Sequence, residues 1–289
     1  MKKIKKYAPV IFLSVLALGV AGIWHQVFYF ETHQNLIVSF FDIGQGDSIF
    51  IEAPDGNQIL IDGGPSDAVL AKLGSVMPFW DRSIDLVILT HAHVDHVAGL
   101  VEVLKRYRVD RVLESGEAYS TPEYQEWHNL IQEKNIPVTI AAAGEEVRAG
   151  VLGISVLSPF ENENGVSFKN PHDANVSARL AYGSTSVLFM GDAEKQIEYR
   201  LAYEHPGELS SDILKVGHHG SKTSTSEEFV KRVRPKFAVI SVGRKNRYGH
   251  PNQQTLDTLQ KFSISVLRTD LDGDVSFVSN GVLFLKQKD

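Results

Sequence analysis

The sequence predicts a layered α/β protein in which two sheets pack together and helices cover the outside. Three observations support this. Short apolar runs typical of buried strands recur along the chain, segments with helical spacing lie between them in both halves, and no low-complexity linker interrupts residues 35–289. Chains with many strands and interspersed helices bury their apolar faces by stacking layers. Residues 35–289 are therefore expected to form one domain.

The first part of this domain is predicted to be rich in strands. Apolar runs bounded by turn residues predict strands at Leu36–Asp42, Ser48–Ala53, Asn57–Asp62 and Ile84–Thr90. The turn Pro54-Asp55-Gly56 has the chemistry of a hairpin connection between the second and third of them. Residues 97–107 follow with the apolar spacing of a helix.

Strands and helices alternate in the rest of the chain. The further predicted strands are Val109–Leu113, Pro137–Ala142, Val151–Leu157, Ser177–Ala181, Ser186–Met190, Ile213–Val216, Phe237–Val242 and Ser265–Arg268. Helices are predicted at Ala193–Tyr203 and Ser226–Val233. Asp274–Val278 and Val282–Leu285 should close the chain as a hairpin around Asn280-Gly281.

Residues 1–30 have the pattern of a membrane anchor or a signal segment. Lysines 2, 3, 5 and 6 precede a stretch from Tyr7 to Phe30 that contains no Asp, Glu, Lys or Arg. An apolar helix of about 20 residues can cross a bilayer, and the lysines should stay on the cytoplasmic side. The sequence thus predicts a single-pass transmembrane helix with the domain outside the cell. Cleavage near Gly19-Val20-Ala21 is the alternative, and it would give a secreted domain.

Composition limits the chemistry. The chain has no cysteine, so thiolate catalysis and thiolate metal ligands are excluded, and any metal must be held by His and carboxylate groups. The net charge of −6 does not favour wholesale binding to a polyanion, although it is compatible with a local basic groove.

The segment His91-Ala92-His93-Val94-Asp95-His96 is the strongest functional signal. It follows the apolar run that ends at Thr90, where a strand fixes the backbone and a loop can turn side chains toward a cleft. His91 and His93 alternate with Ala92, so both can reach one metal, and Asp95 and His96 could bind a second. Imidazole and carboxylate at this density suit zinc, and also manganese or iron. A solvated polar loop is a poor alternative for three His and one Asp in six residues.

This His-x-His-x-Asp-His segment resembles the signature of the metallo-β-lactamase fold, a four-layer αβ/βα sandwich. The segments 41–47, 61–64, 189–192, 214–221 and 246–251 resemble one branch of that fold. The branch is the extracellular hydrolase domain of the competence DNA-uptake channel protein and its stand-alone relatives. The resemblance runs from Leu36 to Phe284. The multi-span channel segment has no counterpart in this sequence, so DNA translocation is not implied.

The resemblance implies two divalent metal ions, Zn or Mn, bound by His91, His93, Asp95 and His96 together with residues from the second half. Asp192, at the end of the strand Ser186–Met190, would bridge the two ions with its two oxygens. The alternative for Asp192 is the N-cap of the helix that starts at Ala193. His219 would complete the second metal site, and His218, whose side chain points elsewhere, would lie outside the ligand set or contact phosphate.

The remaining ligand of the first metal departs from the pattern. Many members of the fold place a His four residues before the Ser that opens the strand leading to the bridging aspartate. Counting back four from Ser177 gives Asp173, with His172 immediately before it. Asp173 is the predicted ligand and His172 the alternative. A carboxylate at this position would favour manganese over zinc.

Other polar residues receive supporting roles. Asp62 would support the metal-binding loop through hydrogen bonds, as the resemblance implies, and Asp47 is predicted to be structural. Lys215 lies in an apolar run before His218, where contact with an anionic substrate would explain a charge; exposure at a strand end is the alternative. His250, in a Gly-Pro loop beside Tyr248, could donate a proton to the leaving group or contact phosphate; a loop histidine packed beside Pro251 is the alternative.

The reaction implied is hydrolysis by a metal-activated water, because two adjacent dications lower the pKa of a shared water. Phosphodiester hydrolysis, with DNA as the first candidate substrate, is predicted by the resemblance. A smaller extracellular phosphodiester, such as a phosphocholine ester, is a second possibility, and a non-catalytic accessory protein is a third. β-Lactam hydrolysis occurs in this fold, but the flanking segments resemble the DNA-uptake branch more closely. The sequence predicts no specific protein partner.

Overall fold

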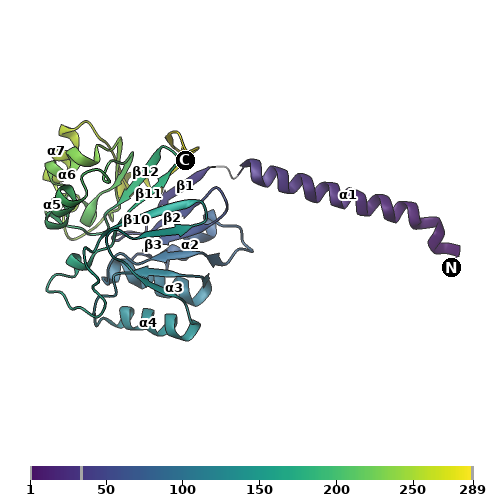
Figure 1. Ribbon diagram of the computed structural model, residues 1–289, viewed down its shortest axis with the longest axis horizontal. Coiled ribbons are helices and arrows are strands. Elements are labelled where there is room, and N and C mark those ends of the chain that lie inside the picture. The colour runs from purple at the N-terminus through teal and green to yellow at the C-terminus, as the bar shows by residue number, and fades with distance from the viewer. Residues whose placement is uncertain (1, 33–34, 288–289) are drawn as a thin grey trace.

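Two sheets packed face to face form the centre of the molecule, and the computed structural model describes residues 2–32 and 35–287. Helices cover the outer face of each sheet, so the layers run helix, sheet, sheet, helix (Figure 1). This arrangement confirms the predicted four-layer αβ/βα sandwich.

The first sheet is antiparallel at one side and parallel at the other. Within the described residues its order is β17-β16-β1-β2-β3-β5-β7-β8, with the switch to parallel pairing at β3. The strands are β1 (Leu36–Phe40), β2 (Ile49–Glu52), β3 (Gln58–Ile61), β5 (Leu86–Ile88), β7 (Val112–Glu114), β8 (Val138–Ile140), β16 (Val275–Ser279) and β17 (Phe284–Lys286).

The second sheet has the same mixed character. Its order among the described residues is β15-β14-β13-β12-β11-β10-β9, antiparallel from β9 to β12 and parallel from β12 to β15. The strands are β9 (Glu146–Ala149), β10 (Leu152–Ser158), β11 (Ser177–Tyr182), β12 (Thr185–Phe189), β13 (Ile213–Lys215), β14 (Phe237–Ile240) and β15 (Ser265–Arg268). A separate short pair joins β4 (Ser83–Ile84) to β6 (Arg108–Val109).

Each sheet has its own set of covering helices. The first is covered by α2 (Ala68–Val76), α3 (Val94–Arg106) and α4 (Pro122–Lys134), and the second by α5 (Lys195–Glu204), α6 (Glu227–Val233) and α7 (Gln253–Lys261). The short α8 (Thr269–Asp272) and the 3₁₀ turns η1 (Pro171–Ala174) and η2 (Gly217–Gly220) lie in connections.

Apolar side chains fill three spaces between the four layers. In β2, Ile49 and Ile51 belong to the core between the sheets, whereas Phe50 packs against the helices of the first sheet. In β12, Phe189 faces the central core and Leu188 faces the helices of the second sheet. Because successive strand residues point to opposite faces, a strand buried on both sides is read in the sequence as a continuous apolar run.

The parallel strands explain where the chemistry collects. In the first sheet the segment that follows β5 carries His91, and in the second sheet the segments that follow β12 and β13 carry Asp192 and His219. Carboxyl ends of parallel strands meet at one edge of a sheet, which is where open α/β sheets commonly bind ligands. Both sheets present that edge to the same site, as the contacts below establish.

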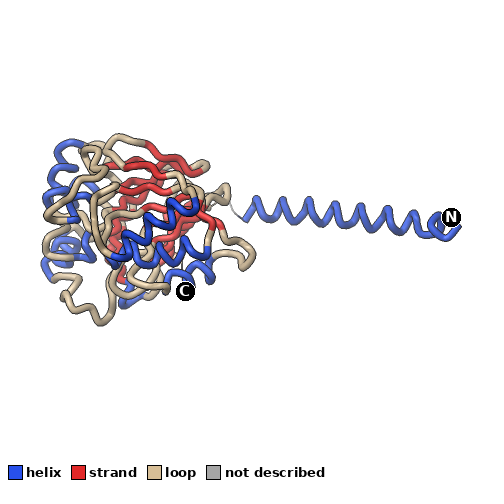
Figure 2. Tube along the Cα trace, turned by 90° about the horizontal axis from the view of Figure 1, so that it is seen from below, coloured by secondary structure: helices blue, strands red, loops and turns tan. Residues whose placement is uncertain are grey.

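Helix α1 (Lys2–Thr32) extends away from the sandwich (Figures 1 and 2). The predicted helix in this region is therefore confirmed. The described residues nevertheless include no helix whose length and apolar character together suffice for crossing a membrane. The predicted transmembrane span is thus not supported.

Several element boundaries differ from those predicted. The run Ile84–Thr90 is not one strand, because Asp85 separates β4 from β5 and its carboxylate accepts a hydrogen bond of 2.7 Å from the amide of Gln58. Helix α3 begins at Val94, three residues earlier than predicted, so Asp95 and His96 lie in its first turn. The helices α2, α4 and α7 were not predicted.

Candidate metal centre

The loop from Thr90 to His96 is fixed by its contact with the loop after β3. The amide of Gly63 donates a 2.8 Å hydrogen bond to the carbonyl of His96, and Gly99 packs directly on Gly63. A Cβ atom at Gly99 would lie 1.8 Å from the Gly63 carbonyl oxygen, and one at Gly63 would lie 2.3 Å from the Leu100 nitrogen. Both positions therefore require glycine, and this close approach seats the first turn of α3 at the edge of the sheet.

Two groups of side chains meet at this edge. We call His91, His93 and His172 the first ligand group. In it, ring nitrogens of His91 and His93 lie 3.0 Å apart, and Nε2 of His172 lies 3.7 Å from Oδ2 of Asp192. One ligand atom from each histidine of this group and one from Asp192 all lie within 4.8 Å of one another. This is the spacing that a single ion needs.

The second ligand group consists of Asp95, His96 and His219. Nε2 of His219 lies 3.5 Å from Oδ2 of Asp95 and 3.5 Å from Oδ1 of Asp192, and Nε2 of His96 is also 3.5 Å from that Oδ1. Asp192 thus turns one oxygen toward each group. A carboxylate placed in this way can bridge two ions, as the resemblance implies.

Unpaired ligand atoms show that these residues fit a metal. Nε2 of His96, Nε2 of His219 and Oδ1 of Asp192 are buried without a hydrogen-bond partner. Buried polar atoms are rarely left unsatisfied because the desolvation is costly. Here the three atoms converge, and their nitrogen and oxygen chemistry suits a divalent cation such as zinc or manganese.

Hydrogen bonds behind the ligands set their orientation. Nδ1 of His96 lies 2.8 Å from Oδ2 of Asp62, whose other oxygen accepts from the Thr90 amide at 2.8 Å. Nδ1 of His219 lies 2.9 Å from the carbonyl oxygen of Ser241. A proton on each Nδ1 leaves Nε2 free to bind a cation, which is the usual way in which outer groups position histidine ligands. The structure thus places Asp62 behind the metal-binding loop, in contact with His96 and Thr90, as predicted.

Asn175 has a similar role that sequence reasoning missed. Its side chain donates to the Met190 carbonyl at 2.9 Å and accepts from the Asp192 amide at 2.8 Å. It is fully buried, and its place within the run Pro171–Asn175 was the only signal for it in the sequence. Glu117 was also missed, and it accepts the Ala92 amide at 2.8 Å, which fixes the loop between His91 and His93.

The protonation of the two groups differs. Burial lowers the pKa of His93 to about 4 and that of His91 well below its ordinary value, so both rings are neutral and able to act as ligands. Burial opposes charge on His219 too, but the carboxylates of Asp192 and Asp47 raise its pKa to about 10. The buried carboxylates of Asp192 and Asp47, beside the second ligand group, therefore call for a compensating positive charge.

The predicted ligand Asp173 lies away from this centre. It lines a separate hollow with Glu163 and Gln196, whereas the adjacent His172 lies in the first ligand group. The 3₁₀ turn η1 separates the directions of the two neighbouring side chains. The geometry therefore replaces Asp173 by His172, the alternative that the sequence had left open.

The predicted substrate contact of Lys215 is also wrong. Its side chain is fully buried, and Nζ lies 2.6 Å from Oδ2 of Asp47 and donates to the Val216 carbonyl at 2.9 Å. Oδ1 of Asp47 in turn lies 3.4 Å from Nδ1 of His219. Lys215 thus neutralises a carboxylate behind the second ligand group and cannot reach a substrate.

A pocket of about 230 Å³ opens over the ligands. His218 and His250 line it, with ring centres 5.7 Å apart, and Nε2 of His218 lies 3.9 Å from Oδ2 of Asp192. Residues 218 and 219 both have positive φ, 48° and 51°, so the backbone turns sharply between the two rings. Glu194, which lies 3.3 Å from Nδ1 of His218, was not singled out in the sequence.

Comparison with known proteins agrees with this geometry. The family described as the metallo-beta-lactamase superfamily matches residues 41–244. ComE operon protein 3 of Bacillus subtilis (strain 168) is 34% identical over 260 residues, which cover 83% of this chain and 32% of that protein. Recombination protein 2 of Haemophilus influenzae is 32% identical over 244 residues, 82% of this chain and 28% of that protein. The chain thus spans about a third of the length of these curated relatives.

Solved structures share the fold at low identity. The metallo-beta-lactamase fold protein YhfI from Bacillus subtilis superposes with a TM-score of 0.57 at 13% identity, covering 87% of this chain and all of that one. CmlA, a diiron beta-hydroxylase from Streptomyces venezuelae, has a TM-score of 0.55 at 16% identity over 87% of this chain and 54% of its own. The resemblance to the competence branch is confirmed by the named relatives, and the chain belongs to the metallo-beta-lactamase superfamily.

Proposed function

We propose that this metal-dependent hydrolase cleaves phosphodiester bonds in DNA. The observation that carries the proposal is Asp192, whose two oxygens face two separate ligand groups beneath an open pocket. Two ions held there would supply Lewis-acid stabilisation and an activated water, which suits in-line displacement at phosphorus. Relatives named ComE operon protein 3 and Competence protein ComA support DNA as the substrate. The likeness to a protein named endoribonuclease YSH1 supports cleavage of a nucleic-acid phosphodiester, without favouring DNA.

The pocket residues have roles of their own in this reaction. His218 and His250 face the pocket next to Asp192, where ring N–H groups can donate hydrogen bonds to non-bridging phosphate oxygens or to the leaving oxygen. Nδ1 of His250 is buried without a hydrogen-bond partner. Glu117 accepts the amide of Ala92 and so fixes the loop that orients His91 and His93 as ligands.

The corrected ligand bears on the choice between the two candidate metals. With His172 in place of Asp173, the first ligand group has three imidazoles. We therefore propose zinc ahead of manganese, since imidazole suits zinc and a carboxylate-rich set suits manganese.

Metal analysis and a substrate panel test the function. The purified protein would be assayed on plasmid DNA, single-stranded DNA, bis-p-nitrophenyl phosphate and p-nitrophenyl phosphorylcholine, with His93→Ala as the control. We expect two divalent ions per chain and cleavage of DNA that the control lacks. Activity on the small esters alone would instead favour a hydrolase of a smaller phosphodiester. Absence of both metal and hydrolysis would favour an accessory role.

We also propose that the domain acts outside the cytoplasm. The support is the sequence alone, in which four lysines precede an apolar segment. Protease added to intact cells should digest the domain. Protection of the domain until the cells are lysed would overturn this location.

A further inference from the structure

A second hollow continues from the metal pocket along the protein surface. We call it the flanking groove. It has a volume of about 510 Å³ and shares Gln45, Asp95 and Tyr248 with the pocket over the ligands. Its remaining walls are Ile43, Gly44, Pro65, Val94, Lys245, Asn246 and Arg247. A substrate longer than the metal pocket would therefore extend into this groove.

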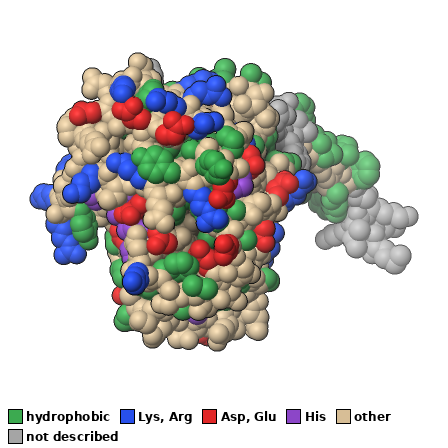
Figure 3. Space-filling view, turned by 60° about the vertical axis from the view of Figure 1, so that its left-hand side comes forward, with side chains coloured by type: hydrophobic (Ala, Val, Ile, Leu, Met, Phe, Trp, Pro, Cys, Tyr) green, Lys and Arg blue, Asp and Glu red, His purple; other side chains and the backbone are tan. Residues whose placement is uncertain are grey.

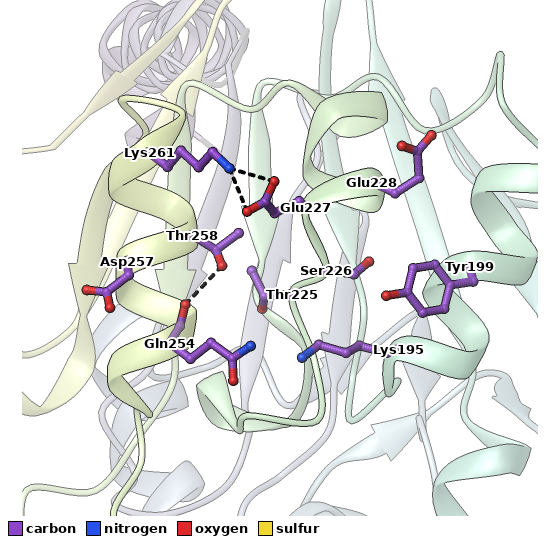
Figure 4. Close-up of a pocket in the computed structure, with 10 residues that line it drawn as sticks. All are labelled: Lys195, Tyr199, Thr225, Ser226, Glu227, Glu228, Gln254, Asp257, Thr258 and Lys261. Carbon is purple, nitrogen blue, oxygen red and sulfur yellow. Dashed lines mark hydrogen bonds and ion pairs between the residues drawn. The ribbon is translucent and has the colours of Figure 1, made fainter.

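No carboxylate in the described part of the chain neutralises the two basic residues of the groove, Lys245 and Arg247. Among the described residues, neither Lys245 nor Arg247 has a carboxylate within ion-pair distance. The hollow between α5, α6 and α7 shows the opposite case, because there Nζ of Lys261 is paired with both oxygens of Glu227 (Figure 4). Acidic and basic side chains are also mixed over the face in Figure 3, so attraction for a polyanion has to be local.

The groove also offers an exposed aromatic side chain, Tyr248, whose ring centre lies 5.3 Å from the guanidinium carbon of Arg247. The side chain of Tyr248 is 56% exposed, and its ring is stacked on His250 with centres 5.9 Å apart. Nη2 of Arg247 donates to the Tyr248 hydroxyl at 3.2 Å. Ile43 and Val94 add apolar side chains to the lining, of which Ile43 is buried and Val94 is exposed. An aromatic ring beside unpaired cations is the combination by which proteins hold unpaired bases and their phosphates.

The loop that carries these residues is braced. Nδ2 of Asn246 donates to the carbonyls of Gly243 and His250 at 2.9 and 2.8 Å, and its Oδ1 accepts the amide of His250 at 2.9 Å. The backbone positions of Lys245 and Arg247 are thus set before a ligand arrives, which lowers the entropic cost of binding.

We propose that the flanking groove binds a single-stranded segment of nucleic acid beside the scissile phosphodiester. This inference rests on the proposed function. Tyr248 stacks on a base, Lys245 and Arg247 contact successive phosphates, and the exposed apolar side chain of Val94 contacts the bases. A duplex hides the faces of its bases, so the groove selects unpaired strands.

Strand binding can be measured apart from cleavage. In a His93→Ala background, fluorescein-labelled dT12 and a duplex of equal length would be titrated by anisotropy. We expect Tyr248→Ala to weaken dT12 binding by about 5-fold or more, and Tyr248→Phe to weaken it much less, because base stacking on a ring carries this contribution. Lys245→Ala and Arg247→Ala should each reduce the salt slope by about 0.7 to 1. The exposed Lys134→Ala on α4 is the matched charge control.

The outcomes separate this inference from the proposed function. Equal dT12 affinity in the parent and in Tyr248→Ala would overturn the proposal that the flanking groove binds a single strand. Duplex binding as tight as single-strand binding would overturn it too. Strand binding that depends on Tyr248 and Lys245, in a metal-loaded parent that leaves DNA intact, would overturn the hydrolase proposal and support the groove. Where the parent cleaves DNA, Arg247→Ala should lower the ratio of kcat/KM on dT12 to that on bis-p-nitrophenyl phosphate by about 5-fold or more, and Lys134→Ala should not.

Discussion

The two histidines of the second ligand group are held by the protein from behind, whereas two of the three histidines of the first group are partly exposed. His96 and His219 are fully buried, and each Nδ1 has an oxygen partner within 3 Å, Asp62 for one and Ser241 for the other. In the first group, His93 and His172 are partly exposed, and Nδ1 of His172 has no hydrogen-bond partner. Preorganised ligands lose less entropy on binding, so the second group should hold its ion more tightly and the first should exchange.

Removal of Asp192 should abolish the difference in metal affinity between the two ligand groups. Of the variants considered, it should have the largest effect on metal content and rate. Asp192→Ala takes one oxygen from each ligand group, so we expect loss of both tightly bound ions and of several kcal/mol of transition-state stabilisation, about 10³-fold or more in rate. Inductively coupled plasma analysis and single-turnover assays measure the two effects. Two ions per chain in a folded Asp192→Ala protein would contradict the bridging place of this residue.

Breaking the buried ion pair of Lys215 and Asp47, behind the second ligand group, should lower the free energy of unfolding. Lys215→Met leaves Asp47 buried without its cation, and removal of one partner from such a pair costs about 3–5 kcal/mol. The free energy of unfolding, measured with denaturant in chelator, should fall accordingly. Lys215→Met combined with Asp47→Leu removes both charges and should recover much of the stability. Unchanged stability in the single variant would show that the pair is not needed.

The two neighbouring residues of η1 offer a test of the first group. His172→Ala removes an imidazole that lies 3.7 Å from Asp192, so the more weakly held ion should be lost, with a larger fall in metal affinity than the about 10- to 100-fold typical of losing an outer partner. Asp173→Ala is the matched control, and its metal content should equal that of the parent. Isothermal titration of apo-protein with Zn²⁺ reports the two steps separately. The reverse result, with Asp173→Ala losing the ion, would restore the ligand predicted from the sequence.

The metal loop was predictable because its chemistry is dense and local. His91 to His96 lie in six residues after one strand, and the largely apolar segments of β12 and β13 predicted the strand ends that Asp192 and His219 follow. The layers were also predictable from local patterns, because short apolar runs alternate along the chain with segments of helical spacing. Spacing along the chain could not decide between His172 and Asp173, because adjacent side chains of a 3₁₀ turn diverge by about a third of a turn.

Lys215 shows another limit of the sequence. Ile213 and Lys215 share one face of β13, and Ile213 belongs to the core between the sheets. The lysine is therefore directed inward, toward a carboxylate from the loop after β1, and that partner is distant in the sequence. Helix α7 was missed for a different reason, since Gln253–Lys261 carries few apolar residues and buries only Thr255 and Leu259.

Asp62, which lies behind His96, should contribute less to metal affinity than a ligand does. Its removal should weaken the binding of one ion only. Asp62→Ala removes the carboxylate that lies 2.8 Å from Nδ1 of His96. Loss of such an outer partner typically lowers metal affinity by about 10- to 100-fold, so we expect the tighter of the two binding steps to weaken toward the looser one. Titration of the apo-protein with Zn²⁺ measures this convergence. Asp62→Asn keeps the shape of the side chain and should fall between parent and Asp62→Ala, because an amide oxygen can still accept from His96 with less charge. If Asp62→Ala instead weakened only the looser step, the assignment of the better-supported group as the tighter site would be wrong.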